Sequence, residues 1–268
     1  MALIAMAVFD TEENDRTKYT ERTLESLSRT VDWNKHRLIV VDNASCTKTS
    51  DYLSIIEQAS NSTQAYPYTR CNGMKVITLP ENIGTAKAVN KAWELRHPNE
   101  HCIKMDNDVV IHQDGWADDM EKAITLDPNI GIVGLKRKDC WENPNRTDFY
   151  KSEMHLLGGG NHRWLPIEKV NHVMGTCQMF NSALLDKIGY LYQPRLYGFD
   201  DSLAAVRCQV AGFYSCFLPH IEIDHIDTGE TPYQKWKENH AGEDMRIFNE
   251  LKNAYINGTK PIYSEATW

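Results

Sequence analysis

Two carboxylates separated by a single residue are the strongest chemical signal in the sequence, in the segment Asp106-Asn107-Asp108. The segment follows the apolar run 101–105, which is typical of a buried strand. Side chains at positions i and i+2 of an extended chain point to the same side, so the two carboxylates could share a hard divalent cation that bridges a diphosphate. The alternative is a polar turn without a ligand, because Asp and Asn are common turn residues.

A second candidate is the segment 79–90, in which Gly84 opens a stretch with helical spacing. The free N–H groups at the start of a helix suit an anion or a nucleotide, and glycine allows a close approach of the backbone. The alternative is a helix start that is capped by an asparagine and binds nothing.

Adjacent acids, Asp200 and Asp201, precede an apolar segment with helical spacing over 200–211. They could serve only as negative charges that favour the start of the helix. In the functional interpretation, one of them is a general base that deprotonates a hydroxyl group.

His225 ends the alternating segment 219–225. A lone histidine is usually structural. As a metal ligand, it would complete the site that Asp108 begins.

The elements that must position these residues alternate along the first 135 residues. The apolar runs predict five strands, and the helical spacing between them predicts four helices. The strands are expected at 2–9, 37–42, 74–79, 101–105 and 130–135, and the helices at 17–30, 48–59, 84–96 and 116–126. This order predicts an α/β fold with a mostly parallel sheet and helices on both faces. Ligands of such sheets lie at the carboxyl ends of the strands, where Asp10, Asp42 and Asp106 stand.

The second half of the chain has less periodicity. Residues 136–169 are polar and irregular, which is typical of a functional loop or lid. A strand is expected at 170–181 and short strands at 213–225. The polar tail from 228 is expected to be helical between 233 and 252, and no linker divides the chain clearly.

Composition narrows the class of protein. The formal net charge of −8 disfavours a protein that binds nucleic acid through phosphate contacts alone. The seven cysteines form no Cys-x-x-Cys pair, so we expect reduced thiols and a cytoplasmic protein. The apolar N-terminus is too short to span a bilayer, and we expect no membrane span.

Taken together, the motifs resemble glycosyltransferase family 2, over about residues 2–226. The resemblance is carried by six segments in the family's order: 38–45, 80–84 with Asn90, 106–108, 127–134, 175–189 and 219–225. It implies a GT-A fold, that is, a Rossmann-like, mostly parallel sheet with a smaller mixed sheet on the acceptor side. It also implies a domain over 1–227, with a nucleotide-sugar-binding half (1–135) and an acceptor-side half (136–227). Residues 228–268 would form a helical tail or lid.

The resemblance further implies inverting transfer of a sugar from a nucleotide-diphosphate donor, expected to be a UDP-sugar, to an acceptor hydroxyl. The residues expected to bind the donor are Asp10, Asp42, Asn82, Gly84, Lys87, Asp106 and Asn107. Asp108 and His225, with Asp106, would hold Mn²⁺ or Mg²⁺. Asp201 would be the general base, with Asp200 beside it. The segment 150–170 and the tail would close over the donor.

The sequence departs from the family pattern at two motifs. The usual Pro-Thr-Tyr-Asn after the first strand is Val8-Phe9-Asp10-Thr11 here, which leaves the role of Asp10 uncertain. The usual Glu-Asp pair is Asp200-Asp201.

Two other functions remain open. A nucleotidyltransferase would favour a glycine-rich, basic loop after the first strand, but residues 10–15 are acidic. The second alternative is a catalytically inactive nucleotide-binding protein.

The acceptor could be a glycan, a protein, a small molecule or a hydroxylated, modified DNA base, and the sequence does not predict the oligomeric state. A local basic cluster is either an acceptor contact or a solvated loop. It consists of Lys136, Arg137, Lys138, Arg146, Lys151 and Arg163.

Overall fold

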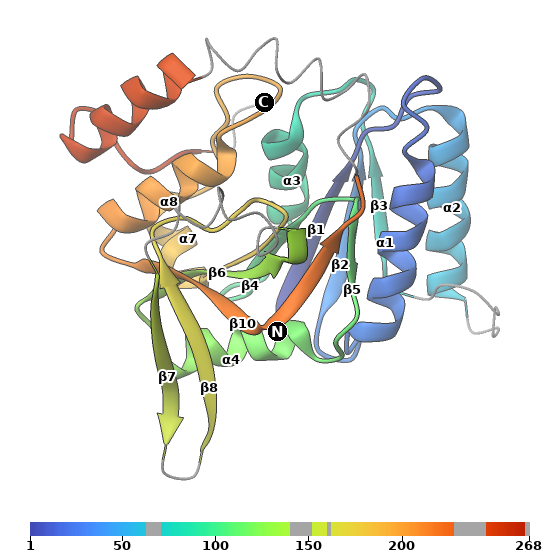
Figure 1. The fold of residues 1–268 in the computed structure, drawn as a ribbon. Coiled ribbons are helices and arrows are strands. Elements are labelled where there is room, and N and C mark those ends of the chain that lie inside the picture. Colours follow the sequence, from blue (N-terminus) through green and yellow to red (C-terminus); the bar gives the residue numbers. More distant parts are fainter. Residues whose placement is uncertain (63–70, 140–151, 160–161, 228–244, 266–268) are drawn as a thin grey trace.

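The computed structural model describes residues 1–62, 71–139, 152–159, 162–227 and 245–265, which form a layered α/β structure (Figure 1). The first half follows the predicted alternation of strands and helices, with one short additional strand, β5. Its elements are β1 (Ala2–Val8), α1 (Thr17–Thr30), β2 (Arg37–Asp42), α2 (Thr47–Asn61), β3 (Lys75–Thr78), α3 (Thr85–Trp93), β4 (His101–Met105), β5 (Val109–Ile111), α4 (Trp116–Leu126) and β6 (Ile130–Arg137).

The second half adds an antiparallel hairpin, a short strand, two helices and a long bent strand. These elements are β7 (Glu153–Gly159), β8 (His162–Val170), β9 (Cys177–Phe180), α7 (Ser182–Ile188), α8 (Asp200–Val210) and β10 (Tyr214–His225). Residues 245–256 of the tail are helical, as predicted for that part. The rest of the predicted tail helix, 233–244, lies outside the described residues.

All of these strands belong to one ten-stranded sheet, in the order β3-β2-β1-β4-β9-β6-β10-β8-β7, with β5 paired to β10. The strands β3, β2, β1 and β4 are parallel neighbours, and β6 is parallel to β10. The predicted fold class is confirmed. The strands of the second half do not form the separate smaller sheet that was expected. They continue the main sheet, because β9 pairs with both β4 and β6 and so joins the two halves.

Helices cover both faces of this sheet, as predicted. Leu24 of α1, Leu53 of α2 and Met120 of α4 are buried in one apolar cluster. Val89 of α3, Leu184 of α7 and Ala204 of α8 are buried in the cluster on the other face. The helical spacing of apolar residues in the sequence therefore corresponds to real buried stripes.

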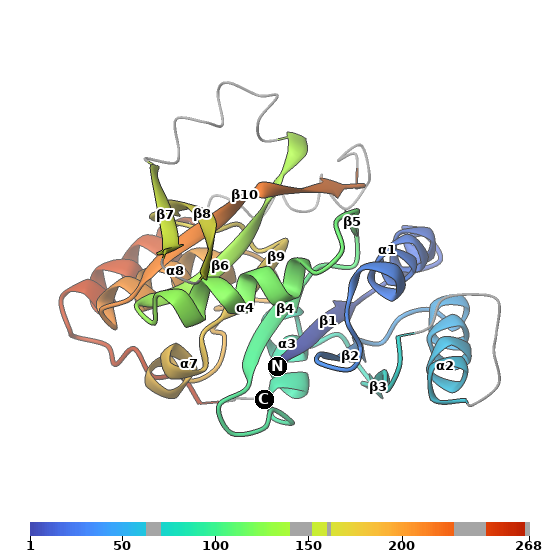
Figure 2. The ribbon, with the colours of Figure 1, turned by 90° about the horizontal axis from the view of Figure 1, so that it is seen from below.

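The expectation of an irregular lid over 136–169 is wrong for the described residues. β7 and β8 form a hairpin beside β10 (Figure 2) and also contact α4, so they are part of the sheet and its packing and are not an irregular lid. Leu165 and Ile167 face the core, but Leu156 and Trp164 on the other face are more than half exposed. Because both faces carry large apolar residues, the alternation that reveals a half-buried strand is absent.

β10 is one strand where several short ones were predicted, and its bend is central to the site. Its pairing with β6 shifts in register between Leu218 and Glu222, around Pro219, which has no backbone N–H to donate. Beyond the bend, β10 pairs antiparallel with β5, and His225 lies opposite Val109. This pairing brings the end of β10 next to the turn that contains Asp106 and Asp108.

The six described cysteines are free, as predicted; Cys140 lies outside the described residues. Among the helices that the structure describes, none is long and apolar enough to cross a membrane.

Arg207, in α8, is fully buried and connects the tail to the domain. Its guanidinium donates to the carbonyls of Ile188, Tyr190 (2.9 Å) and Ile262 (2.7 Å). Since a buried acceptor without a donor is unfavourable, we expect Arg207→Met to lower the free energy of unfolding by about 2–4 kcal/mol, measured by urea denaturation. Arg29→Met is the control: Arg29 is exposed and paired with Glu25, so its loss should change stability by less than about 0.5 kcal/mol. Equal stability of the two variants would refute this role for Arg207.

Candidate active site

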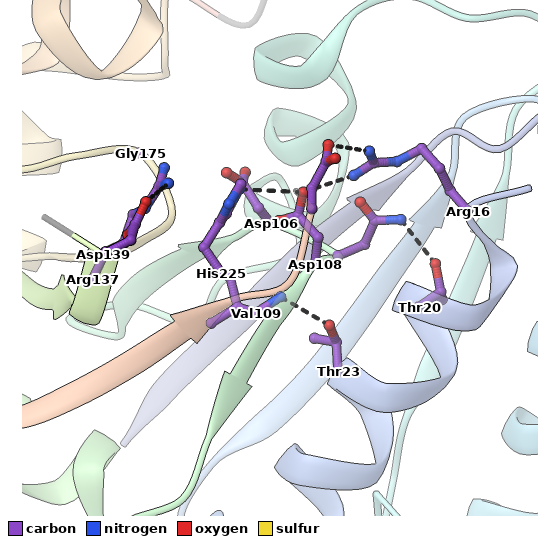
Figure 3. A network of polar contacts seen from close by, with 12 residues as sticks. Arg16, Thr20, Thr23, Asp106, Asp108, Val109, Arg137, Asp139, Gly175 and His225 are labelled. Atoms are coloured by element: carbon purple, nitrogen blue, oxygen red, sulfur yellow. Dashed lines mark hydrogen bonds and ion pairs between the residues drawn. The ribbon is translucent and has the colours of Figure 1, made fainter. Parts of the chain in front are cut away.

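The acids of the Asp106-Asn107-Asp108 segment occupy the turn between β4 and β5. The backbone N–H of Asp106 donates to the carbonyl of Thr176, and the carbonyl of Asp108 accepts from Ile226, both near 3 Å. The turn is thus fixed from the second half of the chain, by the segment before β9 and by the residue that follows β10. Figure 3 shows Asp108 between Arg16 and His225.

The carboxylate of Asp108 is almost completely buried and strongly held. Its Oδ2 accepts from Arg16 at 2.7 Å and lies 3.4 Å from Nε2 of His225, but its buried Oδ1 has no hydrogen-bond partner among the described residues. Burial opposes ionisation, yet His225 and Arg16 outweigh it and hold the pKa of Asp108 well below its usual range. Asp108 is therefore an ionised carboxylate with one oxygen unused.

Arg16 is a central residue that the sequence interpretation missed. It precedes α1, and its buried guanidinium bridges Asp108 and Asp227, which lies 2.5 Å away. The same group lies over the ring of Tyr19, 5.2 Å from its centre. The only sequence signal was a basic residue directly after the acidic run 10–15. Asp227 was also not predicted, since it adjoins the tail.

Lys104, in β4, was missed as well, and it contacts both acidic motifs. Its buried Nζ lies 3.2 Å from Asp106 and 3.3 Å from Asp200, and it donates to the carbonyl of Gly175 at 2.8 Å. Opposite charges in a buried site stabilise one another strongly. Lys104 therefore joins the strand end that carries Asp106 to the start of α8. A lysine within an otherwise apolar strand was the signal that could have indicated this role.

Asp201 and Asp200 lie at the start of α8 in different environments. Asp201 accepts from the backbone N–H of Gly175 (2.9 Å), and its Oδ2 is 3.3 Å from Nε2 of His172. Burial opposes ionisation of Asp201, but His172, Lys104 and the Gly175 N–H hold its pKa at about 2. The side chain of Asp201 is 23% exposed, whereas that of Asp200 is 11% exposed. Asp201 is thus an ionised, oriented carboxylate that solvent can reach.

Two predicted donor ligands turn out to be internal. Asp10 is completely buried, and it accepts from Thr49 (3.0 Å), Thr20 (3.3 Å) and Asn107 (3.4 Å). The side chain of Asn107 is also buried, and it donates to Thr20 at 2.8 Å. The structure does not support the predicted donor contacts of these two residues. Their hydrogen bonds hold the turn in place from the buried side.

The predicted anion site at the start of α3 is also occupied by the chain itself. Three N–H groups there donate to side-chain oxygens: Ile83 to Asn43, Gly84 to Asn82, and Ala86 to Gln193. The expectation of free N–H groups is therefore wrong for these three, and the capped helix start is the better description. Lys87 lies half-buried on α3.

Asp42 ends β2, as predicted, at the same edge of the sheet. Its Oδ1 accepts from the N–H of Ser45 at 2.9 Å and its Oδ2 from the hydroxyl of Ser50 at 2.6 Å. A ligand would have to share or replace one of these contacts.

The three predicted metal ligands are not assembled into one cluster. Within the described ranges, no group of three or more His, Cys, Asp or Glu side chains is arranged to hold a metal. Asp108 and His225 are neighbours, but Asp106 is turned to Lys104. The reason is the local turn: after β4 the chain is not extended, so positions i and i+2 diverge.

Part of the predicted basic cluster is neutralised. Lys136 is buried against Glu168 at 2.7 Å, and Arg137 is paired with Asp139 (Figure 3). Arg146 and Lys151 lie outside the described residues, as does the side chain of Arg163.

The fold is that of a GT-A glycosyltransferase. The chain belongs to glycosyl transferase family 2: the sequence profile of that family matches residues 12–189, more than half of the chain. The protein is therefore a glycosyltransferase. No curated protein sequence is significantly similar to the chain.

Solved structures with the same fold share little sequence with it. A mannosyltransferase, PcManGT from Pyrobaculum calidifontis in complex with GDP-Man and Mn²⁺, superimposes with a TM-score of 0.64 at 15% identity, over 95% of this chain and 69% of that one. TarS 1-349 of S. aureus with UDP-GlcNAc gives 0.56 at 19% identity, over 94% and 66%. GalNAc-T7 with UDP, GalNAc and Mn²⁺ gives 0.57 at 12% identity, over 95% and 50%. The chain thus spans between half and about two thirds of the length of these structures.

The internal position of Asp10 gives a direct test. Asp10→Ala leaves three donors without their acceptor, so we expect the free energy of unfolding to fall by about 1–3 kcal/mol in urea denaturation. Asp51→Ala, at an exposed position of α2, should change it by less than about 0.5 kcal/mol. An Asp10→Ala protein as stable as wild type would show that Asp10 has no structural role.

Proposed function

We propose that this glycosyltransferase moves a sugar from a nucleotide-diphosphate donor, specifically a UDP-sugar, to an acceptor hydroxyl with inversion at the anomeric carbon. The observation that carries the proposal is the ionised, partly exposed carboxylate of Asp201, which accepts from the N–H of Gly175. Lys104 bonds to the carbonyl of the same Gly175 and to the strand-end acid Asp106. Solved structures of the same fold contain GDP-Man, UDP or UDP-GlcNAc, which supports a nucleotide-sugar donor.

The donor is proposed to bind along the carboxyl ends of β2 and β4, without using the N–H groups at the start of α3 that already bond within the chain. Asp42 would accept from the base or ribose by replacing its contact with Ser50. Asn82, Gly84 and Lys87 border the same edge, with Asp106 next along it. Binding there is consistent with ligand positions in other open α/β sheets.

A divalent cation, Mn²⁺ or Mg²⁺, fits the residues at Asp108. The buried Oδ1 of Asp108 has no hydrogen-bond partner within the described structure, and His225 adjoins the other oxygen. Asp108 and His225 would hold the ion, and the donor diphosphate and water would complete its coordination. When bound, the ion would neutralise charge on the leaving diphosphate. Mn²⁺ in two of the similar structures supports this assignment.

Asp201 is proposed as the general base. The acceptor oxygen would attack the anomeric carbon as its proton passes to the Asp201 carboxylate, and the bond from that carbon to the diphosphate would break. Asp200 is less suited, because it is more buried and lies against Lys104. The contacts from Gly175 and His172 would fix the direction of the Asp201 carboxylate.

We further propose that residues 1–227 are the catalytic domain, with donor-side (1–135) and acceptor-side (136–227) halves, and that the tail assists the site. The helix 245–256 lies beside α8, and Phe248 stacks on Phe199 with ring centres 5.0 Å apart, directly before the two acids.

The predicted cytoplasmic location rests on the free cysteines alone. Acidic residues 10–15 and family membership disfavour the nucleotidyltransferase.

Metal dependence tests the Asp108 site. We expect EDTA to abolish sugar transfer and hydrolysis of the UDP-sugar, and Mn²⁺ or Mg²⁺ to restore both, because the leaving diphosphate would otherwise stay unneutralised. Asp108→Ala should lose this activity and also weaken Mn²⁺ binding in calorimetry, with the folded circular dichroism spectrum retained. Full activity after complete chelation would refute the metal assignment.

Substituting the two acids of α8 one at a time distinguishes their roles. We expect Asp201→Asn to lower kcat for transfer by about 100-fold or more, the usual contribution of a positioned base. UDP binding in the presence of Mn²⁺ should stay close to wild type in calorimetry. Asp200→Asn is the matched control and should be milder. Normal transfer by Asp201→Asn together with an inactive Asp200→Asn would assign the base to Asp200. Normal transfer by both would remove both acids from the mechanism.

A further inference from the structure

A cavity outside the candidate active site lies between the end of α3, helix α7 and the C-terminal segment. Its volume is about 180 Å³, and it is lined by Trp93, Arg96, Leu185, Asp186, Gly189, Tyr190 and Tyr263. A cavity of roughly 150 Å³ accommodates benzene, so this one has room for a single six-membered ring. The α3 helix has nine residues, which places its two ends roughly 14 Å apart. The cavity is at the end away from Gly84 and the donor-binding edge.

Two lining residues carry N–H groups that the described chain leaves without an acceptor. Nε1 of Trp93 and Nη1 of Arg96 are both buried and have no hydrogen-bond partner within the described structure. Trp93 itself is only 1% exposed. Buried donors in native proteins are nearly always satisfied, by protein groups, by ordered water or by a ligand. These two residues at the cavity wall therefore have donor capacity that a ligand with acceptor oxygens can use.

The charge of the cavity points to a neutral ligand. The Nη2 of Arg96 is already paired with Asp186 at 2.7 Å, so the pair has no net charge. An anion would meet the Asp186 carboxylate as well as the guanidinium. A polyol can use both groups, because its hydroxyls donate to the carboxylate and accept from Arg96 and Trp93.

The remaining walls are aromatic. Tyr190 and Tyr263 line the cavity together with Trp93, and Tyr263 is 52% exposed. The faces of aromatic rings are negative, and the C–H groups of a sugar ring are slightly positive, so the two surfaces attract. An aromatic wall beside an Arg–Asp pair therefore suits the two sides of a pyranose, one apolar and one rich in hydroxyls.

The cavity is built by a specific docking of the tail. Ser264 forms a parallel β-bridge with Gly189, and the backbone N–H of Tyr190 donates to the carbonyl oxygen of Ser264 at 2.8 Å. A Cβ atom at Gly189, which has a φ of 69°, would lie only 2.1 Å from that carbonyl oxygen. Only glycine permits this approach, and the approach places Tyr263 on the cavity.

The segment that leaves the cavity leads to the proposed base. From Tyr190 the chain runs antiparallel along α3: Leu191 bonds to Asn90, Gln193 to Ala86, and Leu196 packs on Gly84. It then reaches Phe199, Asp200 and Asp201. A ligand in the cavity and an acceptor at the base would thus lie along one continuous stretch of chain.

We propose that this cavity is a second carbohydrate subsite, which binds a neutral pyranose residue of a glycan acceptor at a distance from the reaction centre. The assignment of that sugar to the acceptor rests on the function proposed above, and it makes a glycan the acceptor class. Binding of a sugar in the cavity does not depend on that function and can be measured alone.

The test uses the full chain labelled with ¹⁵N and titrated separately with glucose, mannose, galactose and N-acetylglucosamine, in the presence of saturating UDP and Mn²⁺. The indole N–H signal of Trp93, assigned with Trp93→Phe, should shift with at least one sugar, because the surroundings of a side chain in the cavity wall change on binding. Tyr263→Ala and Arg96→Met should each weaken the binding by about tenfold or more, which corresponds to about 1.4 kcal/mol. Trp164→Ala, an exposed aromatic residue on the β7–β8 hairpin, is the matched control and should bind as wild type.

Three results would overturn the proposal: no shift with any of the four sugars, unchanged binding by both Tyr263→Ala and Arg96→Met, or a shift with sodium acetate in place of the sugars. Hydrolysis of the UDP-sugar, measured in the same proteins, separates the two proposals. A wild-type protein that hydrolyses the donor but binds no sugar in the cavity would refute the subsite and leave the transferase function standing. A protein that binds the sugar but never hydrolyses or transfers from the donor would refute the function and retain the subsite.

Discussion

The ammonium group of Lys104 is the contact on which the candidate active site depends. Asp106 comes from the end of β4 and Asp200 from the start of α8, and both lie within 3.3 Å of this one nitrogen. Carboxylates repel one another when they are brought together away from water, and a shared buried cation reverses the sign of that interaction. Lys104 also binds the carbonyl of Gly175, whose N–H orients Asp201. The first half of the chain, through β4, and the second half, through α8, are therefore joined by charge as well as by the sheet.

Arg16 pairs with Asp108, the other acid of the turn, as Lys104 pairs with Asp106. It compensates Asp108 and Asp227, and Lys104 compensates Asp106, so that both acids of the turn have a cationic neighbour before any ligand binds. A donor diphosphate would add negative charge to a site whose own charges are already paired. Under the proposed mechanism, this is the reason that a divalent cation is needed, and the unused oxygen of Asp108 is where it would bind.

The bend in β10 and the course of residues 189–198 give this arrangement its geometry. The register shift around Pro219 lets one strand pair with β6 and then with β5, which places His225 beside Asp108. The chain along α3 caps the start of that helix through Gln193 and carries Phe199 and the two acids to the site. The tail, held by Arg207 and Ser264, completes the cavity at the far end. The segment 189–198 thus connects the cavity to the two acids at the start of α8.

The sequence by itself determined the alternating strands and helices of the first half and the family of the chain. Those features depend on local periodicity and on short motifs such as 106–108, which do not need a partner far along the chain. The hairpin β7–β8 was not predicted because both of its faces carry apolar residues, and its inner face is defined by packing against other elements, α4 among them, and by the pairing of β8 with β10.

Tertiary structure decided which polar residues can meet a ligand. Asp10 and Asn107 are strand-end polar residues like Asp106, but Thr20 and Thr49 enclose them. Lys104, Arg16 and Asp227 became site residues only because chain segments far apart in sequence converge on the turn. Sequence spacing fixes which way neighbouring side chains point along one element, whereas burial and charge pairing depend on contacts between elements, and these exist only in the folded chain.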